Sequence, residues 1–485
     1  MPSLSRRRFI QLSAAGSIAA GTLGSSSLAA ETRPVVQPEA DAGHPTRELA
    51  HYLATARLEQ IPAKVRKEAA RTLLNWVGVA VGGAQHETVT RALAALQPFA
   101  GPAQAQVVGR KDRTDIMSAS LINGICSHVL DFDDTHLKTI IHVSSVVVPP
   151  ALALAEHLPK VSGSQFLHAI VLGGETALRA GNAVYPDHYD VGWHITGTAG
   201  AIGAAATAGH LLGLNEQQIV WALGLAASQS VGLRESFGSM NKSFNPGRAA
   251  QNGLMAALLA QQGFTSSDQM LEARRGWAHT VSTKQNFKEI TEGLGRRFEM
   301  ALNTYKPFAC GIVIHPIIDG CIQLRGGLNL SDINGVELRV HPLVLELTGK
   351  TAPRDGLEGK FSVYHAAAIA LLEGRAGPRQ FSDAAVQAST TVALRKKITA
   401  VVDPAVKESQ ADVTVLLRDG TKRQVFVTQA IGSAENPMTD TMLTDKVTDL
   451  MDGVLPPARI KEVIQTCWDI EKLPDAARLG RMLQA

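Results

Sequence analysis

The sequence predicts a mainly α-helical protein, in which a large all-helical domain carries a smaller α+β domain as an insertion. Its 485 residues suggest two or more domains with ample material for a buried core. Alanine and glycine are abundant, whereas aromatic residues make up only 5% of the chain, which favours closely packed helices with small residues at their contacts. Helical patterns prevail over residues 46–302 and 434–485, and strands alternate with helices between 303 and 433.

The first thirty residues are expected to be a targeting signal rather than part of the folded domain. Residues 5–10 match the twin-arginine export pattern, a weakly apolar region follows to about Leu28, and Ser27–Ala29 offers small residues for cleavage. The alternative is a disordered basic tail; a membrane span is not expected, because the apolar region is short and rich in Gly and Ser. We expect residues 1–30 to be a twin-arginine signal peptide and 31–45 a linker. The partner would then be the twin-arginine export machinery, and the location of the folded protein periplasmic.

The helices of the larger domain follow from periodicity and from start and stop signals. A helix beginning at Pro62 should stop at Gly82-Gly83. The Pro149-Pro150 pair is expected to interrupt the apolar run after His142, which rules out a transmembrane reading of that run. The other helices are predicted over residues 46–58, 115–130, 164–182, 196–212 and 249–263.

The smaller domain, residues 303–433, mixes both kinds of element. Helices are predicted over 315–324 and 361–373, a strand over 333–341, and a hairpin around Asp419-Gly420. Helices return after Ala434, and we expect them to pack back on the first helical region. A cleft between the two domains would be the default ligand pocket.

An acidic stretch in the helical domain is the first candidate site. Asp131, Asp133 and Asp134 stand within four positions, followed by Thr135 and, seven residues later, His142. Carboxylates so close repel one another, so a site must hold them with cations, hydrogen bonds or a metal, or leave them in water. The alternative is an acidic loop that also caps the next helix.

Two further stretches point to anion binding. His194 stands directly before a helix of mostly Ala and Gly, whose free N–H groups could hold an anion, although a histidine there can also be a cap. The polar stretch 236–248 leads into another helix, with Lys242 and Arg248 flanking its start. Solvated surface cations are the alternative for these two residues.

Other classes of protein are disfavoured by the bulk composition. The net charge is only +3, without the clustered basic face of a nucleic-acid-binding protein. The four cysteines are scattered without a CxxC pair, so neither a zinc nor an iron–sulfur site is indicated. We find no cofactor motif and expect neither a metal nor a cofactor.

Several motifs together resemble the MmgE/PrpD family, which includes 2-methylcitrate dehydratase, cis-aconitate decarboxylase and iminodisuccinate epimerase. They are LDFDDTH with the following His142, GWH at His194, NKSFNPGRAAQNG, KPFACGIVIHP and FSVYHA, in this order and from about residue 45 onward. The resemblance implies a helical domain with an α+β lid domain, a homodimer, and cofactor-independent chemistry on small di- and tricarboxylic acids. The family's site positions fall on Asp131, Thr135, His142, His194, Lys242, Lys306 and Tyr364.

The resemblance and the residues lead to one functional hypothesis with alternatives. We expect a lyase that dehydrates a 2-methylcitrate-like hydroxy acid through an enediolate-type intermediate. Decarboxylation or epimerisation of a related acid, or carboxylate binding without turnover, are the alternatives. The catalytic residues would be Asp131, as base or orienting a histidine, with His142, His194 and Tyr364. The substrate would be held by Thr135, Lys242, Arg248 and Lys306.

Two positions depart from the family's branches. The decarboxylase branch has a histidine five positions after the lysine that matches Lys306, where this chain has Gly311. The dehydratase branch commonly has Trp after Asp-Thr, where this chain has His136. Neither named activity therefore follows from the resemblance alone.

Overall fold

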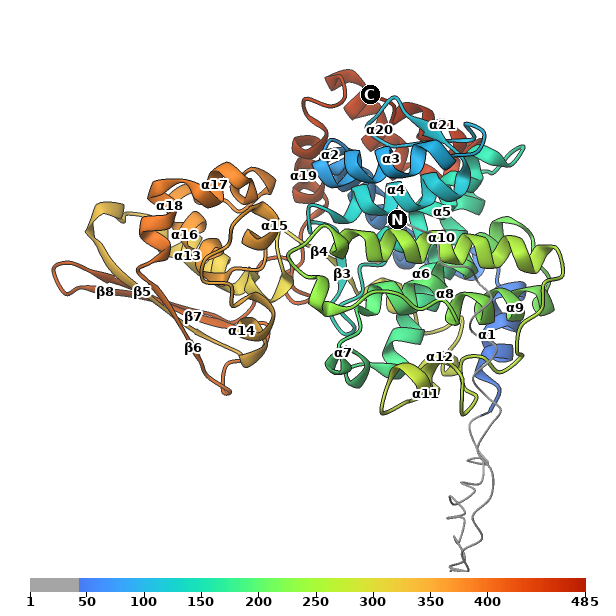
Figure 1. Ribbon diagram of the computed structural model, residues 1–485, viewed down its shortest axis with the longest axis horizontal. Coiled ribbons are helices and arrows are strands. Elements are labelled where there is room, and N and C mark those ends of the chain that lie inside the picture. The colour runs from blue at the N-terminus through green and yellow to red at the C-terminus, as the bar shows by residue number, and fades with distance from the viewer. Residues whose placement is uncertain (1–42) are drawn as a thin grey trace, which may run out of the picture. The chain divides into compact units, whose positions relative to one another are not determined.

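Helices build most of the first part of the chain in the computed structural model, which describes residues 43–485 (Figure 1). The predicted signal peptide and nearly all of the predicted linker lie outside the described residues. The helices are α1 (Pro45–Thr55), α2 (Ala63–Gly83), α3 (Glu87–Leu96), α4 (Ile116–His128), α5 (Ser144–His157), α6 (Gly163–Val184), α7 (Asp187–Val191), α8 (Ile195–Leu211), α9 (Glu216–Ala227), α10 (Asn241–Gln261), α11 (Trp277–Val281) and α12 (Lys288–Thr291). Short antiparallel pairs join β1 (Ala105–Gln106) to β2 (Arg113–Thr114) and β3 (Asp134–His136) to β4 (Asn303–Tyr305). The predicted mainly α-helical class is confirmed.

Small residues let the central helices approach one another closely. Helix α8 is buried from its first residue to Gly209. A Cβ placed on its Gly203 would lie 2.5 Å from the backbone oxygen of Gly173 in α6, so only glycine fits this contact. The expectation that abundant Ala and Gly mark close helix packing is confirmed here.

Two predicted helix boundaries are wrong, and proline explains both. Helix α5 continues through Pro149-Pro150, because every residue from Ser144 to Ala155 is buried and tertiary packing outweighs the lost backbone hydrogen bonds. Helix α10 begins at Asn241 rather than at residue 249 and contains Pro246 within it. As a result Lys242 lies in the first helical turn and not in a loop.

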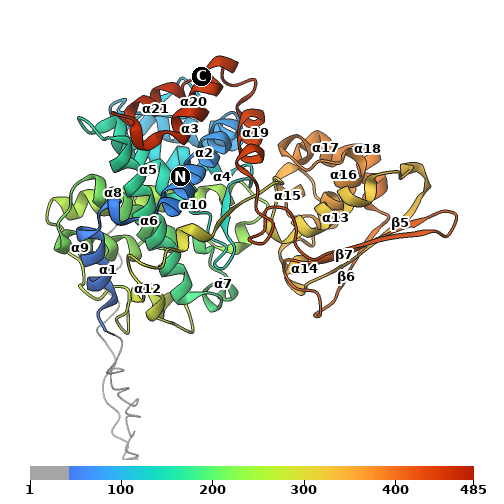
Figure 2. The ribbon, with the colours of Figure 1, turned by 180° about the vertical axis from the view of Figure 1, so that it is seen from behind.

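The region from residue 308 to about 430 combines a four-stranded sheet with helices. The sheet order is β6-β5-β7-β8; β5 runs parallel to β6, and the other pairs are antiparallel. Helices α13 and α16 cover one face of this sheet (Figures 1 and 2). The predicted hairpin around Gly420 is confirmed. The elements are α13 (His315–Arg325), β5 (Ile333–Val340), α14 (Pro342–Thr348), α15 (Gly356–Gly359), α16 (Val363–Glu373), α17 (Asp383–Gln387), α18 (Ser389–Arg395), β6 (Ile398–Val402), β7 (Ala411–Leu417) and β8 (Lys422–Val427).

The C-terminal helices return to the start of the chain. They are α19 (Asp440–Met451), α20 (Pro457–Trp468) and α21 (Ala477–Met482). Helix α19 lies beside α2 in both ribbon views (Figures 1 and 2), and a Cβ on Gly78 of α2 would meet Val447 of α19 at 2.8 Å. Arg71 of α2 also pairs with Asp440 of α19.

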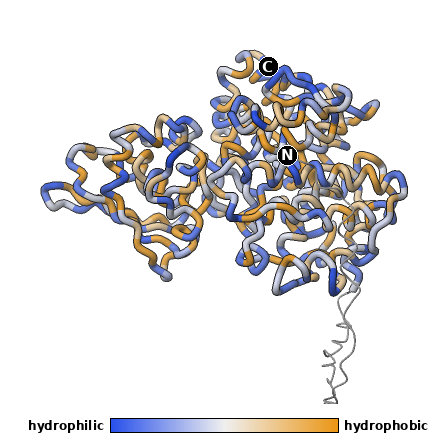
Figure 3. The backbone as a smooth tube through the Cα atoms, viewed as in Figure 1, coloured by the Kyte–Doolittle hydropathy of each residue, from blue (hydrophilic) through white to orange (hydrophobic). Residues whose placement is uncertain are grey.

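Two groups of buried apolar residues form the cores. One lies among α1–α12 and the C-terminal helices, and the other lies around the four-stranded sheet. Apolar residues, orange in Figure 3, recur along the helices and strands of both regions. Residues 42–485 make one compact unit by their contacts, and the finer boundaries at 302 and 433 remain a prediction. Among the described helices, none combines the length and apolar character that crossing a bilayer requires.

Candidate active site

The acidic stretch forms a tight, buried connection between α4 and α5. Within it, Asp131 has φ 51° and Ile140 has φ 58°, the two non-glycine residues of the described chain with positive φ. This conformation is unfavourable above all for a β-branched residue such as Ile140. The backbone N–H of Ile140 donates to the oxygen of His136 at 2.7 Å, which helps to hold the turn. Both strained residues face the same cavity.

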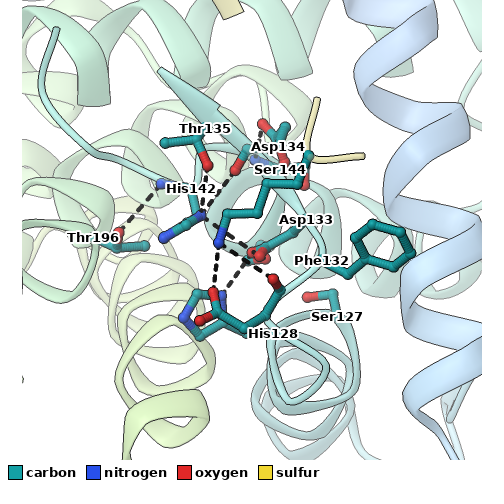
Figure 4. A network of polar contacts seen from close by, with 12 residues as sticks. Ser127, His128, Phe132, Asp133, Asp134, Thr135, His142, Ser144 and Thr196 are labelled. Carbon is teal, nitrogen blue, oxygen red and sulfur yellow. Dashed lines mark hydrogen bonds and ion pairs between the residues drawn. The ribbon is translucent and has the colours of Figure 1, made fainter. Parts of the chain in front are cut away.

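Each of the three carboxylates has its own partners. Figure 4 shows Asp133 beside His128 and Asp134 beside Ser144, and each pair is hydrogen-bonded. Asp131 accepts from two lysines, and Asp134 also accepts from the amide of Asn303 at 2.7 Å. All three are almost wholly buried, so the stretch is not left in water. The alternative of an acidic loop that caps the next helix agrees with one contact, because Asp134 accepts from the backbone N–H of Ser144, the first residue of α5. Burial and the charge of Asp133 raise the pKa of Asp134 to about 6.

A relay of hydrogen bonds runs from Asp133 to Lys242. Nδ1 of His128 lies 2.6 Å from Oδ2 of Asp133, and Nε2 of His128 lies 2.8 Å from Nζ of Lys242. Burial would raise the pKa of Asp133, but the adjoining histidines hold it well below its usual range. The ionised carboxylate therefore accepts the Nδ1 proton, and Nε2 of His128 accepts from the lysine.

Asp131 is the counter-ion of two buried lysines. Its Oδ1 lies 3.1 Å from Nζ of Lys242 and 2.5 Å from Nζ of Lys306. Burial alone would raise the pKa of Asp131, yet the two lysine charges hold it well below its usual range. Such a carboxylate is a weak base, and among the described residues it makes no hydrogen bond or ion pair with a histidine side chain. The geometry supports a role of Asp131 in fixing two cations, and the predicted role as a base or as a group that orients a histidine stays a prediction.

His142 presents a free lone pair to the cavity. Its Nδ1 lies 2.8 Å from the backbone oxygen of Asp134, and since a carbonyl oxygen can only accept, Nδ1 carries the proton. The hydroxyl of Thr135 lies 3.2 Å from the same nitrogen (Figure 4). Nε2 is thus left unprotonated and has no partner among the described residues, which suits a proton acceptor.

His194 presents the opposite tautomer. The hydroxyl of Ser236 donates its single proton to the oxygen of Leu233 at 2.7 Å, so it can only accept from Nδ2 of Asn245 at 3.1 Å. The same amide nitrogen lies 3.0 Å from Nδ1 of His194, so Nδ1 accepts and Nε2 carries the proton. His194 can therefore donate a proton from Nε2.

The cavity beside these histidines is narrow, with a volume of about 30 Å³, which is room for about two water molecules. Its polar lining consists of Asp131, His142, His194, Lys242 and Lys306, with Tyr189 and Thr348. The rings of Phe237 and Phe361 lie 5.4 and 5.6 Å from Nζ of Lys242. These two aromatic side chains cover the ammonium from the helical part and from the sheet-containing part.

The structure brings five of the eight predicted site residues together in this lining. Thr135 lies behind the wall, fully buried, where its hydroxyl orients His142 rather than a substrate. Arg248 donates to Gln251 on its own helix and is not part of the lining. Tyr364 packs at the edge of the sheet-containing core, also outside the lining.

Sequence reasoning missed the residues that hold the site in place. His128, Asp133 and Asn245 orient Lys242, His142 or His194, as described above. Lys446 of α19 donates to the backbone oxygens of Phe132 at 2.6 Å and Lys306 at 2.9 Å, and so ties both segments to the C-terminal helices. Asp133 and Asn245 stood inside quoted motifs and could have been singled out. Lys446 lies in an ordinary amphipathic helix, where no sequence motif distinguishes it from other lysines.

The imidazoles of His128, His142 and His194 come close enough to suggest a metal site. One nitrogen of each lies within 4.8 Å of the others. However, Nε2 of His128 is occupied by the Lys242 ammonium, and Lys306 adds a second positive charge beside the same cavity. A cation there would meet two buried ammonium groups, so the arrangement favours an anion.

The tautomer of His194 can be tested at Asn245, a positioning residue. Asn245→Asp should lower kcat about 10- to 100-fold, because a carboxylate accepts the Nδ1 proton and leaves Nε2 without one. Asn245→Ala removes the hydrogen-bond partner of His194 without imposing a tautomer, so it should lower kcat less than Asn245→Asp does. If Asn245 only filled space, the near-isosteric Asp would be the milder change; steady-state kinetics of both variants decides.

The fold and the site combine a mainly helical framework with a buried cavity that two histidines and two lysines line. The MmgE/PrpD N-terminal domain matches residues 47–290, and the MmgE/PrpD C-terminal domain matches residues 308–470. The chain belongs to the MmgE/PrpD family, which confirms the resemblance carried by its motifs.

Curated relatives agree with this placement. Cis-aconitate decarboxylase of Aspergillus terreus is 26% identical over 468 residues, covering 90% of this chain and 95% of that protein. The enzyme of the same name from Mus musculus is 23% identical over 460 residues, covering 90% and 93%. The 2-methylcitrate dehydratase of Cupriavidus necator is 25% identical over 247 residues, covering 45% and 49%. The chain is thus an MmgE/PrpD-type lyase.

Proposed function

We propose that the enzyme removes water from a hydroxy tricarboxylic acid of the 2-methylcitrate type. The observation that carries this proposal is the pair of opposite tautomers in one cavity. His142 offers a lone pair and His194 offers a proton, which are the two groups that an elimination of water needs.

The proposed reaction balances with these two groups. His142 Nε2 takes the proton from the carbon next to a carboxylate, and the electrons of that C–H bond form the new C=C bond. The C–O bond breaks with its electron pair on the hydroxyl, which leaves as water with the Nε2 proton of His194. Lys242 and Lys306 stabilise the charge that develops on the carboxylate. We propose that no cofactor is needed, because these lysines supply the positive charge.

Decarboxylation is the second candidate, favoured by the cis-aconitate decarboxylases that match nearly the whole chain. Loss of CO₂ needs a cationic site and a proton donor, but no base at the carbon. Gly311 forms part of the cavity wall, at the position where the resemblance places a histidine in the decarboxylase branch. The other departure, His136, bonds Thr139 away from the cavity. The missing side chain at Gly311 therefore supports dehydration over decarboxylation.

One assay separates the candidates. The purified protein is incubated with 2-methylcitrate, citrate, cis-aconitate and iminodisuccinate, and the products are followed by mass spectrometry and chiral chromatography. Loss of water from a hydroxy acid supports the dehydratase. Release of CO₂ from cis-aconitate supports the decarboxylase, and inversion without mass change supports an epimerase. Thermal stabilisation by these acids without any product would support a carboxylate-binding protein.

The pH profile should reflect neutral histidines. Burial and the adjoining lysine charges hold the pKa of both His142 and His194 well below the usual value of about 6.5. As pH falls from 8 to 6, neither imidazole gains a proton, so log kcat should stay flat and decline only at more acidic pH. An acid limb in kcat centred near 6.5 would contradict this. Using kcat separates the effect from titration of free substrate.

Two further proposals rest on the sequence alone. We propose that the twin-arginine pattern at residues 5–10 directs export of the folded enzyme to the periplasm, and that the enzyme works as a homodimer. Cell fractionation with an Arg6→Lys/Arg7→Lys/Arg8→Lys variant tests the first, and sedimentation of the purified protein tests the second.

A further inference from the structure

Lys360 is a buried lysine that the site described so far does not use. Its side chain is only 4% exposed, and its Nζ has no hydrogen-bond acceptor or carboxylate partner among residues 43–485. The ammonium lies 5.4 Å from the ring of Phe381. Lys242, Lys306 and Lys446, the other lysines of this region, each have polar partners. An unpaired buried cation is costly unless a ligand completes it.

Lys360 lines a second cavity that adjoins the first. This cavity is small, with a volume of about 10 Å³, and it shares Asp131, Lys242 and Phe361 with the cavity of His142 and His194. The backbone oxygen of Lys360 accepts from the N–H of Gly311 at 3.1 Å, which ties it to the wall of that larger cavity. The two cavities are thus neighbouring compartments around Lys242.

The first turn of α10 contributes to the same compartment. Ser239, Lys242 and Ser243 form part of its lining, and α10 is 21 residues long. The N–H of Lys242 already donates to the oxygen of Ser239 at 3.2 Å, so the helix contributes mainly the partial positive charge of its N-terminus, which favours an anion. Burial lowers the pKa of Lys360 to about 8, against the charge of Asp131, which raises it. Most Lys360 side chains are therefore still charged at neutral pH.

We propose that Lys360 and the first turn of α10 form a carboxylate subsite, which holds the carboxylate farthest from the reacting carbon. The subsite makes the enzyme select tricarboxylic over dicarboxylic acids. Lys242 and Lys306 bind the carboxylate at the reacting carbon, and Lys360 pairs with the distal one. The lining of the joined compartments, with three lysines and Asp131, then has a surplus of positive charge for the substrate. This inference deepens the proposed function and rests on it for the identity of the reacting carbon.

The test compares two unreactive acids that differ by one carboxylate. Tricarballylate and glutarate have the same five-carbon dicarboxylic backbone, and tricarballylate adds a third carboxylate. Affinities are measured by calorimetry or thermal shift on the full protein, so that the result does not depend on turnover. The wild type should prefer tricarballylate, and Lys360→Met should lower that preference about 10- to 100-fold, as for loss of a charged hydrogen bond. Lys360→Arg should keep most of it.

Two further variants support the comparison. Lys396→Met removes an exposed lysine from the same part of the chain and should leave the preference unchanged. Ser239 is exposed and lines the compartment, so Ser239→Asp should weaken tricarballylate more than glutarate by repulsion. This second variant keeps the test valid if Lys360→Met does not fold.

The outcomes distinguish the subsite from the reaction. If the wild type shows no preference for tricarballylate, or if Lys360→Met and Ser239→Asp lower both affinities equally, the subsite is overturned. If the preference exists and is lost in these variants while no hydroxy acid is dehydrated, the subsite stands and the proposed reaction fails. If a hydroxy acid is dehydrated but both variants keep the preference for tricarballylate, the proposed reaction stands and the subsite is overturned.

Discussion

Replacing His142 with Gln should lower kcat/KM about 10²- to 10⁴-fold, the usual contribution of a general base. The amide of Gln can still donate to the backbone oxygen of Asp134, but it cannot take a proton from carbon. Because Asp133, Lys242 and His128 keep their own bonds, the protein should fold normally. The readouts are the steady-state rate on the acid that the assay identifies and the melting temperature of the variant.

Solvent exchange separates His142 from His194. When the reaction is run in D₂O, unreacted substrate recovered from the wild type or from His194→Gln should carry deuterium at the acidic carbon, since His142 is intact in both. His142→Gln should show neither exchange nor product. His210 lies on α8 outside the cavity, and His210→Gln is the matched control with wild-type rates. A His142→Gln variant within about threefold of wild type would show that the base is another group.

The sequence was sufficient for the fold class and for the chemistry-bearing stretches. Most helices were predicted from glycines that end a helix and prolines that begin one, and the β7–β8 pair was predicted from its alternating pattern. These signals are local in the sequence. Five polar residues of the cavity stood in recognisable motifs. Their partners were harder to find, since Lys446 reaches Lys306 from a helix 140 positions further along the chain, a pairing that only tertiary structure creates.

The wrongly predicted start of α10 explains why Arg248 does not lie where a substrate-binding residue was expected. Arg248 was predicted to flank the start of a helix together with Lys242. In the structure both residues belong to α10, where six positions correspond to about 120° around the helix axis. Lys242 therefore faces the cavity while Arg248 turns toward Gln251. A continuous helix through Pro246 could not be predicted locally, because proline disfavours it and burial decides.

Asp131→Asn should destabilise the fold by about 3–5 kcal/mol at neutral pH, as expected when one partner of a buried ion pair is removed. The amide carries no charge, so Lys242 and Lys306 would stand close together without their shared counter-ion. Burial already lowers the pKa of Lys242, so this lysine can lose its proton in part, which limits the loss of folding stability. Thermal or urea unfolding of wild type and variant measures the difference.

The pH dependence identifies the charge as the cause. The folded pKa of Asp131 is held well below its unfolded value of about 3.8, so its ion pair stabilises the protein above that pH and is lost as pH falls through the folded value. The difference between wild type and Asp131→Asn should therefore be full at pH 5–7 and shrink below pH 4. Asp469→Asn breaks an exposed pair with Lys472 and should leave the melting temperature nearly unchanged. An equal loss for Asp131→Asn at pH 7 and pH 3 would mean that packing or the positive φ, rather than the lysine charges, makes this residue necessary.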